Sequence, residues 1–230
     1  LMMKRNFQCN IKVDEYKYRK YVKRNIHNLT DTDRLNGYTK RQLNQYMENI
    51  LKLIDFSRFN IAQSRKEIQN VSDLYGIPVT ADEIEVAEKC LKWGSYSHDI
   101  VDYTDMVWIP YELGLSPKGL QYDWIMFDEC QDASLMSLQL FDKCFKRGTR
   151  FLAVGDSDQT INLFAGSSVN AFNILSHKPH TQNFSLPITY RCAKSIVRYA
   201  NSVVPEIKAR EDAPEGEVKR NVHVRDIVYD

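Results

Sequence analysis

The chain has 230 residues, of which 43% are hydrophobic and 27% charged, as in an ordinary soluble globular protein. It contains no run near the roughly 18 apolar residues of a membrane span and no signal-peptide pattern, so we expect no membrane partner. The five cysteines are odd in number and include no CxxC pair. They favour reduced thiols and a cytoplasmic location over a disulfide framework or a zinc site.

The charge is unevenly distributed along the chain. The net charge is +1, but residues 1–30 hold eight Lys/Arg against two acids and are therefore about +6. This asymmetry indicates a basic face that could meet phosphates.

Residues 14–100 are predicted to be mostly helical. "TKRQLNQYMENILKLID" repeats apolar residues at i, i+3, i+4 and i+7. This face consists of Leu43, Tyr46, Met47, Ile50, Leu53 and Ile54. In "TADEIEVAEKCLKWG", Thr80 followed by Glu83 predicts a capping box, and Gly94 predicts the end of that helix.

The preceding stretch "EYKYRKYVKR" has two interpretations. It interleaves three tyrosines with five cations: Tyr16, Tyr18, Tyr21, Lys17, Arg19, Lys20, Lys23 and Arg24. Such mixing suits a groove that binds nucleic acid through charge and stacking. The alternative is a solvated helix face whose tyrosines pack inward, and it is at least as well supported.

A different pattern follows residue 100. "YDWIMFDE" and "RFLAVGD" are short apolar runs of the kind buried on both faces of a parallel sheet. Between them, "SLMSLQLFDKCFKRG" is amphipathic, with Leu135, Leu138, Phe141 and Phe145 inward and Gly148 at its end. The sequence therefore predicts a βαβ unit in an α/β fold, with helices on both faces of the sheet.

Both predicted strands end in acids, and ligands of open α/β sheets bind beyond the carboxyl ends of strands. In "FDECQD", Asp128 could hold Mg²⁺ while Glu129 orients or deprotonates an attacking water. In "VGDSDQ", Gln159 could sense a phosphate, and Gly155 would let backbone approach closely. Separately, the first cluster could simply cap a helix and the second could be an Asp-rich turn. Their spacing of 28 residues makes coincidence less favoured.

Three segments resemble motifs of a known family. "FDECQDAS", "AVGDSDQTINLFAGSS" and "LPITYRCAKSIVRYAN" resemble motifs II, III and IV of superfamily 1A helicases, the UvrD/Rep/PcrA group, in order and approximate spacing. "VDYTDMVWIPYEL" resembles the "dfdDLl" segment that precedes motif II there. The resemblance covers about residues 100–202.

The resemblance implies an ATP-dependent DNA helicase that uses ATP and Mg²⁺, moves 3′ to 5′ on single-stranded DNA and acts at duplex junctions. Asp128 would bind Mg²⁺ and Glu129 would be the catalytic base. Gln159 would contact the γ-phosphate, Arg191 would be the arginine finger, and Tyr190 would stack near the adenine. Gln131, Asp132 and Asp156 would couple the nucleotide state to DNA.

The chain departs from the family at two points. Motif III usually reads "QxIYxFRGA"; here Asn162 replaces an aromatic residue and Ala165 an arginine, while Phe164 remains as a possible base-stacking platform. No Gly-Lys pair occurs anywhere, so the Walker A loop is missing. We therefore expect a fragment of a helicase motor that is inactive alone.

The resemblance also implies a domain order and a fold, a partial RecA-like parallel-sheet P-loop NTPase core with an inserted all-helical subdomain. Residues 1–19 and 96–186 would belong to lobe 1A, 20–95 to the helical 1B insertion, and 187–230 to the start of lobe 2A. A further strand is expected in "NVHVRDIVY".

Two other classes remain open. A metal-dependent nuclease could use acids from both clusters as ligands: Asp128, Glu129, Asp132, Asp156 and Asp158. A scaffold with a catalytically dead motor fold would bind nucleic acid indifferently to ATP.

Overall fold

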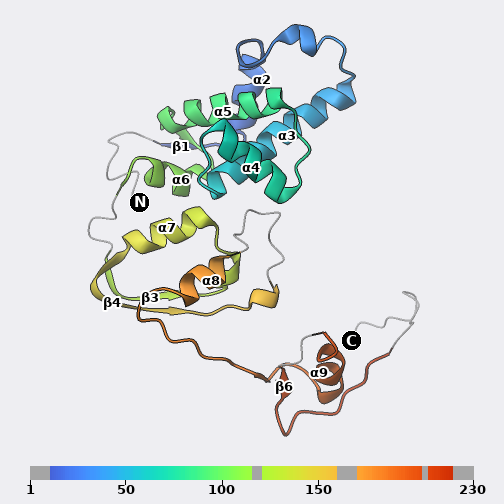
Figure 1. The fold of residues 1–230 in the computed structure, drawn as a ribbon, viewed down its shortest axis with the longest axis vertical. Helices are drawn as coiled ribbons and strands as arrows, with labels where there is room; N and C mark the ends of the chain where they lie inside the picture. Colours follow the sequence, from blue (N-terminus) through green and yellow to red (C-terminus); the bar gives the residue numbers. More distant parts are fainter. Residues whose placement is uncertain (1–10, 116–120, 160–169, 204–206, 220–230) are drawn as a thin grey trace. The chain divides into compact units, whose positions relative to one another are not determined.

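The computed structural model describes residues 11–115, 121–159, 170–203 and 207–219 (Figure 1). The chain forms two compact units, divided between Pro179 and His180. Within the described ranges, no helix combines the length and apolarity that crossing a bilayer requires.

The first unit opens with a helical segment framed by two short parallel strands, β1 (Lys12–Val13) and β2 (Ile100–Val101). In chain order the helices are α2 (Lys17–Leu29), the 3-10 turn η1 (Thr32–Arg34), α3 (Lys40–Phe59), α4 (Arg65–Tyr75), α5 (Ala81–Tyr96) and, after β2, α6 (Asp105–Glu112). Residues 14–100 are thus mostly helical, as predicted.

Three of these helices start at complete capping boxes. The side chains of Thr39, Ser64 and Thr80 each accept a hydrogen bond from the third helical residue, whose own side chain accepts one from the cap. Each box satisfies two backbone donors that the first turn would otherwise leave open. The box at Thr80 confirms the prediction made from the sequence.

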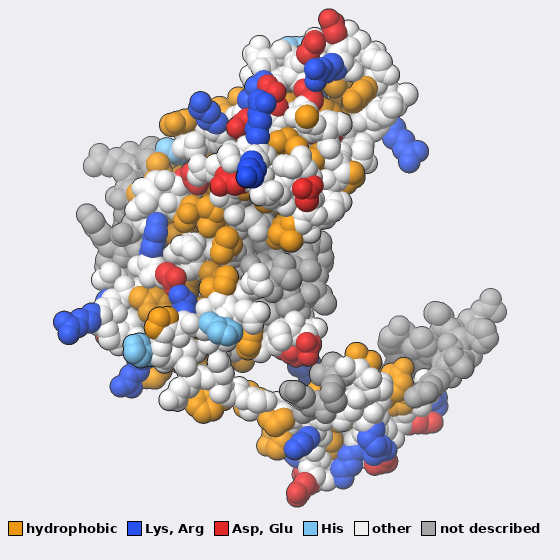
Figure 2. All heavy atoms as spheres, in the orientation of Figure 1, with side chains coloured by type: hydrophobic (Ala, Val, Ile, Leu, Met, Phe, Trp, Pro, Cys, Tyr) orange, Lys and Arg blue, Asp and Glu red, His pale blue; other side chains and the backbone are white. Residues whose placement is uncertain are grey.

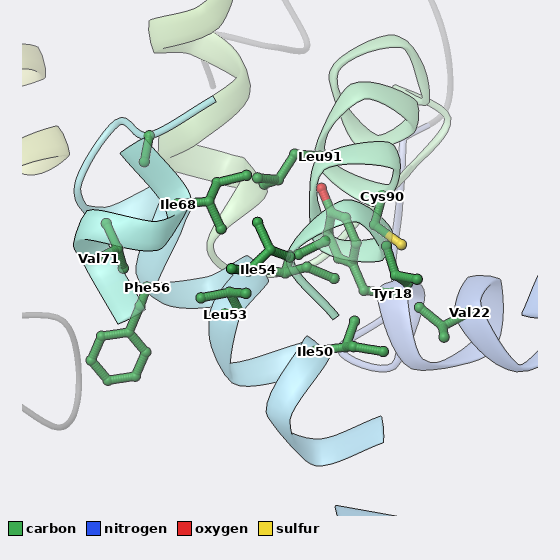
Figure 3. Packing of buried hydrophobic residues seen from close by; sticks show 14 of the residues in the cluster. Tyr18, Val22, Ile50, Leu53, Ile54, Phe56, Ile68, Val71, Cys90 and Leu91 are labelled. Atoms are coloured by element: carbon green, nitrogen blue, oxygen red, sulfur yellow. The ribbon is translucent and has the colours of Figure 1, made fainter. Parts of the chain in front are cut away.

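The helices share one core, shown in Figure 3. From α3, Ile50, Leu53 and Ile54 are fully buried. Leu43, assigned to the same face, lies in the first turn of α3 and keeps 39% of its surface exposed. The i, i+3, i+4 pattern therefore predicts the middle of the helix correctly and overestimates the burial of its start.

Gly94 does not end α5, contrary to the prediction, because the helix runs on to Tyr96. A Cβ at Gly94 would lie 2.0 Å from the Tyr18 hydroxyl oxygen. The glycine therefore serves close packing of α2 against α5 and not helix termination.

The rest of the first unit is the predicted βαβ arrangement. Its elements are β3 (Tyr122–Phe127), the 3-10 turn η2 (Cys130–Asp132), α7 (Leu135–Lys143), β4 (Phe145–Ala153), the 3-10 turn η3 (Ser157–Gln159) and α8 (Ala171–Ser176). β3 and β4 pair in parallel. The protein is thus a mixed α/β fold with parallel strands.

The predicted end of the connecting helix was wrong. α7 stops at Lys143, and Phe145 opens β4 instead of closing the helix. Gly148 lies inside β4 at φ 87°, a conformation that glycine adopts without Cβ strain. The pairing register with β3 shifts between Tyr122 and Trp124, which accommodates these extra residues.

The expectation that β3 and β4 are buried on both faces was also wrong for the described residues. On one face, Phe127 packs in a small cluster with Leu138 of α7 and Leu175 of α8. On the other face, Trp124 and Met126 are 55% and 75% exposed. Because strand side chains alternate between faces, an apolar run predicts a strand but does not show that both sides are covered.

The second unit contains a parallel pair, β5 (Ile188–Thr189) with β6 (Lys208–Ala209), and the helix α9 (Lys194–Ala200) between them. The strand predicted within residues 221–229 lies outside the described residues.

Candidate functional site

The acidic pair lies at the carboxyl end of β3. Both Asp128 and Glu129 are exposed, and the Glu129 amide donates to Asp128 Oδ1 at 3.0 Å. Glu129 has left-handed backbone angles, φ 49° and ψ 44°, which are uncommon for a residue with a side chain. The turn η2 begins directly afterwards, and the Asp132 amide donates to the Glu129 carbonyl at 3.0 Å.

Gln131 connects the ends of β3 and β4. Its Nε2 donates to Glu129 Oε2 at 2.7 Å, and its Oε1 accepts from the Asp156 amide at 3.1 Å. Asp156 Oδ2 in turn accepts from Gln159 Nε2 at 2.7 Å. The structure therefore brings Glu129, Gln131, Asp156 and Gln159 together in one hydrogen-bonded chain.

A glycine makes room for this chain of contacts. A Cβ at Gly155 would lie 2.5 Å from Gln131 Oε1 and 2.7 Å from Cys130 Sγ. The Cys130 thiol is itself buried, and burial raises its pKa. The sequence predicted that Gly155 lets backbone approach closely. The added Cβ would indeed lie 3.3 Å from the Cys130 main-chain nitrogen, and the Gln131 amide also takes up space beside the glycine.

The donor set suits Mg²⁺ bound mainly through water and phosphate. In phosphoryl-transfer sites Mg²⁺ binds one or two protein carboxylates together with oxygens of the substrate phosphates. Asp128, exposed at the end of a strand, can supply such a carboxylate. Within the described ranges, no three His, Cys, Asp or Glu side chains are grouped to hold a metal ion.

Lys17, predicted to contact nucleic acid, is instead 3% exposed. Its ammonium forms an ion pair of 2.6 Å with Asp105 and donates to the Ser97 carbonyl at 2.9 Å. Tyr18 is also buried, and Tyr21 stacks on Trp93 with 3.7 Å between ring centroids. Tyr18 and Tyr21 therefore match the alternative in which the tyrosines pack inward. Tyr16 does not, because it is 52% exposed, and the buried Lys17 fits neither interpretation.

Lys17 belongs to a buried ionic centre that the sequence did not reveal. Arg58, fully buried, bonds Asp102 through two contacts of 2.7 and 2.8 Å and Asp105 at 2.7 Å, and also pairs with Asp55. Partial burial, together with the nearby carboxylates of Asp102 and Asp105, raises the pKa of Asp55. Both Asp102 and Asp105 stand in "VDYTDM", so the acidic spacing was visible, but its partner 44 residues away was not.

The other cations of α2 are exposed. Arg19 pairs with Glu48 and Lys20 with Asp14, while Lys23 and Arg24 also lie at the surface. Figure 2 shows blue and red side chains intermixed over this part of the first unit. Four of the five cations that the sequence suggested for nucleic-acid binding are therefore exposed on α2.

Four further candidate residues were predicted from the sequence. Asn162 and Phe164 lie outside the described residues. Tyr190 and Arg191 belong to the second unit and are exposed; Arg210 lies over the Tyr190 ring at 5.7 Å from its centroid.

Taken together, the fold and site define an α/β protein with carboxylates and amides gathered beyond the ends of two parallel strands, where such folds bind ligands. Residues 2–180 match the sequence model of the UvrD/REP helicase N-terminal domain. Because the match covers more than half of the chain, this chain belongs to the UvrD/REP helicase family.

Individual relatives agree with this assignment. The ATP-dependent DNA helicase PcrA of Bacillus subtilis is 31% identical over 142 residues, 59% of this chain and 18% of the relative. The ATP-dependent DNA helicase Rep of Buchnera aphidicola (subsp. Baizongia pistaciae) is 26% identical over 115 residues, 47% and 17% respectively. The F-box DNA helicase protein 1 of Schizosaccharomyces pombe is 35% identical over 81 residues, 35% and 9%. The chain thus spans less than a fifth of each relative.

Proposed function

We propose that this chain is part of an ATP-dependent DNA helicase motor that couples ATP hydrolysis to 3′–5′ movement on single-stranded DNA and to duplex unwinding. The observation that carries the proposal is the hydrogen-bonded chain from Glu129 through Gln131 and Asp156 to Gln159, at the ends of two parallel strands. The family membership and the names of the relatives support it.

In this proposal different residues at the two strand ends perform different steps of ATP hydrolysis. Glu129 accepts the proton of the attacking water, and Asp128 holds Mg²⁺, which supplies positive charge next to the phosphates. Gln159 contacts the γ-phosphate. Because Gln159 is hydrogen-bonded to Asp156, its amide is already held near the end of β4.

The second unit would complete the site when the motor closes. Arg191 would stabilise the charge of the transition state as an arginine finger, and Tyr190 would stack near the adenine. An arginine supplied from a separate lobe acts only in the closed state, which links hydrolysis to movement.

We assign residues 1–19 and 96–186 to a RecA-like lobe 1A, 20–95 to an inserted helical subdomain, and 187–230 to the start of lobe 2A. DNA would contact the exposed α2 cations Arg19, Lys20, Lys23 and Arg24, together with Asn162 and Phe164. Because the sequence has no Gly-Lys pair, the phosphate-binding loop is not within it, and the chain alone should not hydrolyse ATP at a meaningful rate.

The test is ATP turnover, with and without single-stranded DNA, by the longest natural product that contains this chain. We expect DNA-stimulated turnover that falls at least about 100-fold in Glu129→Gln. Gln139→Glu, at an exposed position of α7, is the control and should keep the wild-type rate. DNA binding without any turnover would replace the helicase by the scaffold, whereas metal-dependent DNA cleavage without ATP would indicate a nuclease.

A further inference from the structure

We propose that Gln131 is a positioning residue that holds the Glu129 carboxylate in place and ties it to the chain segment carrying Gln159. The inference rests on the proposed function, since it concerns how the base of that site is oriented. It differs from a general role in coupling to DNA, because it assigns a specific contact at each end of one side chain.

The orientation of the Gln131 amide is fixed by its partners. The Asp156 main-chain amide can only donate, so the atom it meets at 3.1 Å must be the side-chain oxygen. An ionised Glu129 carboxylate can only accept, so the atom 2.7 Å from it must be the side-chain nitrogen. Both contacts require the same rotation of the amide, and a flipped amide would lose both.

Burial makes these two contacts consequential. Gln131 is 3% exposed, so water cannot readily replace a lost partner. Its bond to Glu129 is charge-assisted, the stronger class of hydrogen bond. The carboxylate that it holds projects from an exposed backbone in the left-handed conformation, where the main chain alone does not fix the side chain.

The position of the Gln131 amide requires a glycine at residue 155. A Cβ there would lie 2.5 Å from Gln131 Oε1, closer than any real Cβ contact, so an alanine must displace the amide or the strand end. The glycine is needed for space, because its φ is not positive.

These contacts connect the residues that follow β3 to the residues that follow β4. Gln131 belongs to η2 after β3, whereas Asp156 and Gln159 follow β4. A shift of the β4 end, sensed through Gln159, would move the Asp156 amide and, through Gln131, the Glu129 carboxylate. The base and the proposed phosphate sensor are therefore held in one geometry.

The test uses two isosteric or near-isosteric changes in the full-length protein. Gln131→Glu keeps an oxygen for the Asp156 amide but replaces the donor to Glu129 by a second carboxylate oxygen. Gln131→Met keeps the length of the side chain and removes both contacts. We expect kcat to fall about 10- to 100-fold in each, the equivalent of one charge-assisted hydrogen bond, with KM for ATP within about threefold.

Two further measurements separate positioning from folding. In the Glu129→Gln background, Gln131→Glu should add less than about a twofold further loss, because its effect is exerted through Glu129. Amide hydrogen exchange at Asp156 should accelerate at least about tenfold in Gln131→Met and stay near wild type in Gln131→Glu. The exchange measurement needs no ATP turnover.

The outcomes distinguish this inference from the proposed function. Wild-type turnover that Glu129→Gln abolishes, together with a normal kcat in Gln131→Glu, would overturn the positioning role alone. Unchanged exchange at Asp156 in Gln131→Met would overturn it as well. Gln139→Glu controls for an added surface carboxylate and should match wild type in both measurements.

Discussion

The helical segment and the β3–β4 strand pair differ in how they are stabilised. The helical segment encloses a large core in which Ile50, Leu53 and Ile54 have no exposed surface, and it buries the ion pairs of Arg58 with Asp102 and Asp105. The strand pair has a cluster of only a few buried residues and leaves Trp124 and Met126 largely exposed on its other face.

The difference places most of the buried core in the helical segment, whereas we propose that the strand ends carry the chemistry. The helical segment buries Lys17 and Arg58 in ion pairs with Asp105, whereas the strand ends expose Asp128 and Glu129. Exposed acids can receive a metal ion and a nucleotide, but they contribute little to folding. Substitutions in the two regions should therefore separate into effects on stability and effects on activity.

The largest loss of stability should follow Arg58→Met. Removing this guanidinium takes the ion pair from the buried Asp102 and leaves Asp105 with Lys17 as its ionic partner, and breaking such a centre costs about 3–5 kcal/mol. Urea unfolding followed by far-UV circular dichroism measures the change. Arg19→Ala, which breaks an exposed pair with Glu48, should cost less than about 1 kcal/mol. Equal costs for the two variants would contradict the distinction between buried and exposed pairs.

Truncating apolar side chains compares the two regions directly. Leu53→Ala should lower the free energy of unfolding by about 2–5 kcal/mol, since it opens a cavity in a fully buried site. Met126→Ala removes a side chain that is 75% exposed and should change it by less than about 0.5 kcal/mol. A larger loss for Met126→Ala would show that the open face of the strand pair is covered in solution.

A smaller effect is expected where two helices meet. Gly94→Ala places a Cβ 2.0 Å from the Tyr18 hydroxyl oxygen and should destabilise the fold by about 1–3 kcal/mol through overpacking. Gly37→Ala is the matched control, because a Cβ added at that position would have nothing within 4 Å. Thermal unfolding of both variants measures the difference. If Gly94→Ala and Gly37→Ala both melted at the wild-type temperature, close packing of α2 against α5 would be refuted.

Thiol labelling compares the accessibility of the helical core with that of the strand-pair region in the unmutated protein. Burial raises the pKa of Cys90 to about 12, so at pH 8 its thiol is protonated as well as inaccessible. Cys144, half-buried after α7, should react with an alkylating reagent before Cys90 does. Mass spectrometry of the labelled chain reads both sites. Labelling of Cys90 should require denaturant or a pH well above 9, and rapid labelling at pH 8 would contradict a closed core.

Local signals in the sequence predicted the elements but not their partners. The Thr80 capping box and the middle of α3 follow from patterns within a few residues, and both are present. Gly94 was misread because its function depends on Tyr18, 76 positions earlier, and not on its own helix. The start of β4 was misread because Phe145 and Gly148 continue an apolar pattern that suits helix and strand alike.

The candidate site shows the same limit. The acids and amides at the two strand ends were found from the sequence, and the structure joins Glu129, Gln131, Asp156 and Gln159. Lys17 was misassigned because charge and aromatic interleaving do not reveal which face of a helix is buried. Its buried partner, Asp105, lies 88 residues away, beyond the reach of any local pattern.

The most direct test of the central claim is single-turnover hydrolysis of bound ATP by the longest natural product, comparing wild type with Glu129→Gln in the presence of single-stranded DNA. If the ends of β3 and β4 form a hydrolytic site, the variant should bind ATP with near-normal affinity and hydrolyse it at least about 100-fold more slowly. Hydrolysis at the wild-type rate by Glu129→Gln would contradict the assignment of Glu129 as the base and, with it, the proposed site.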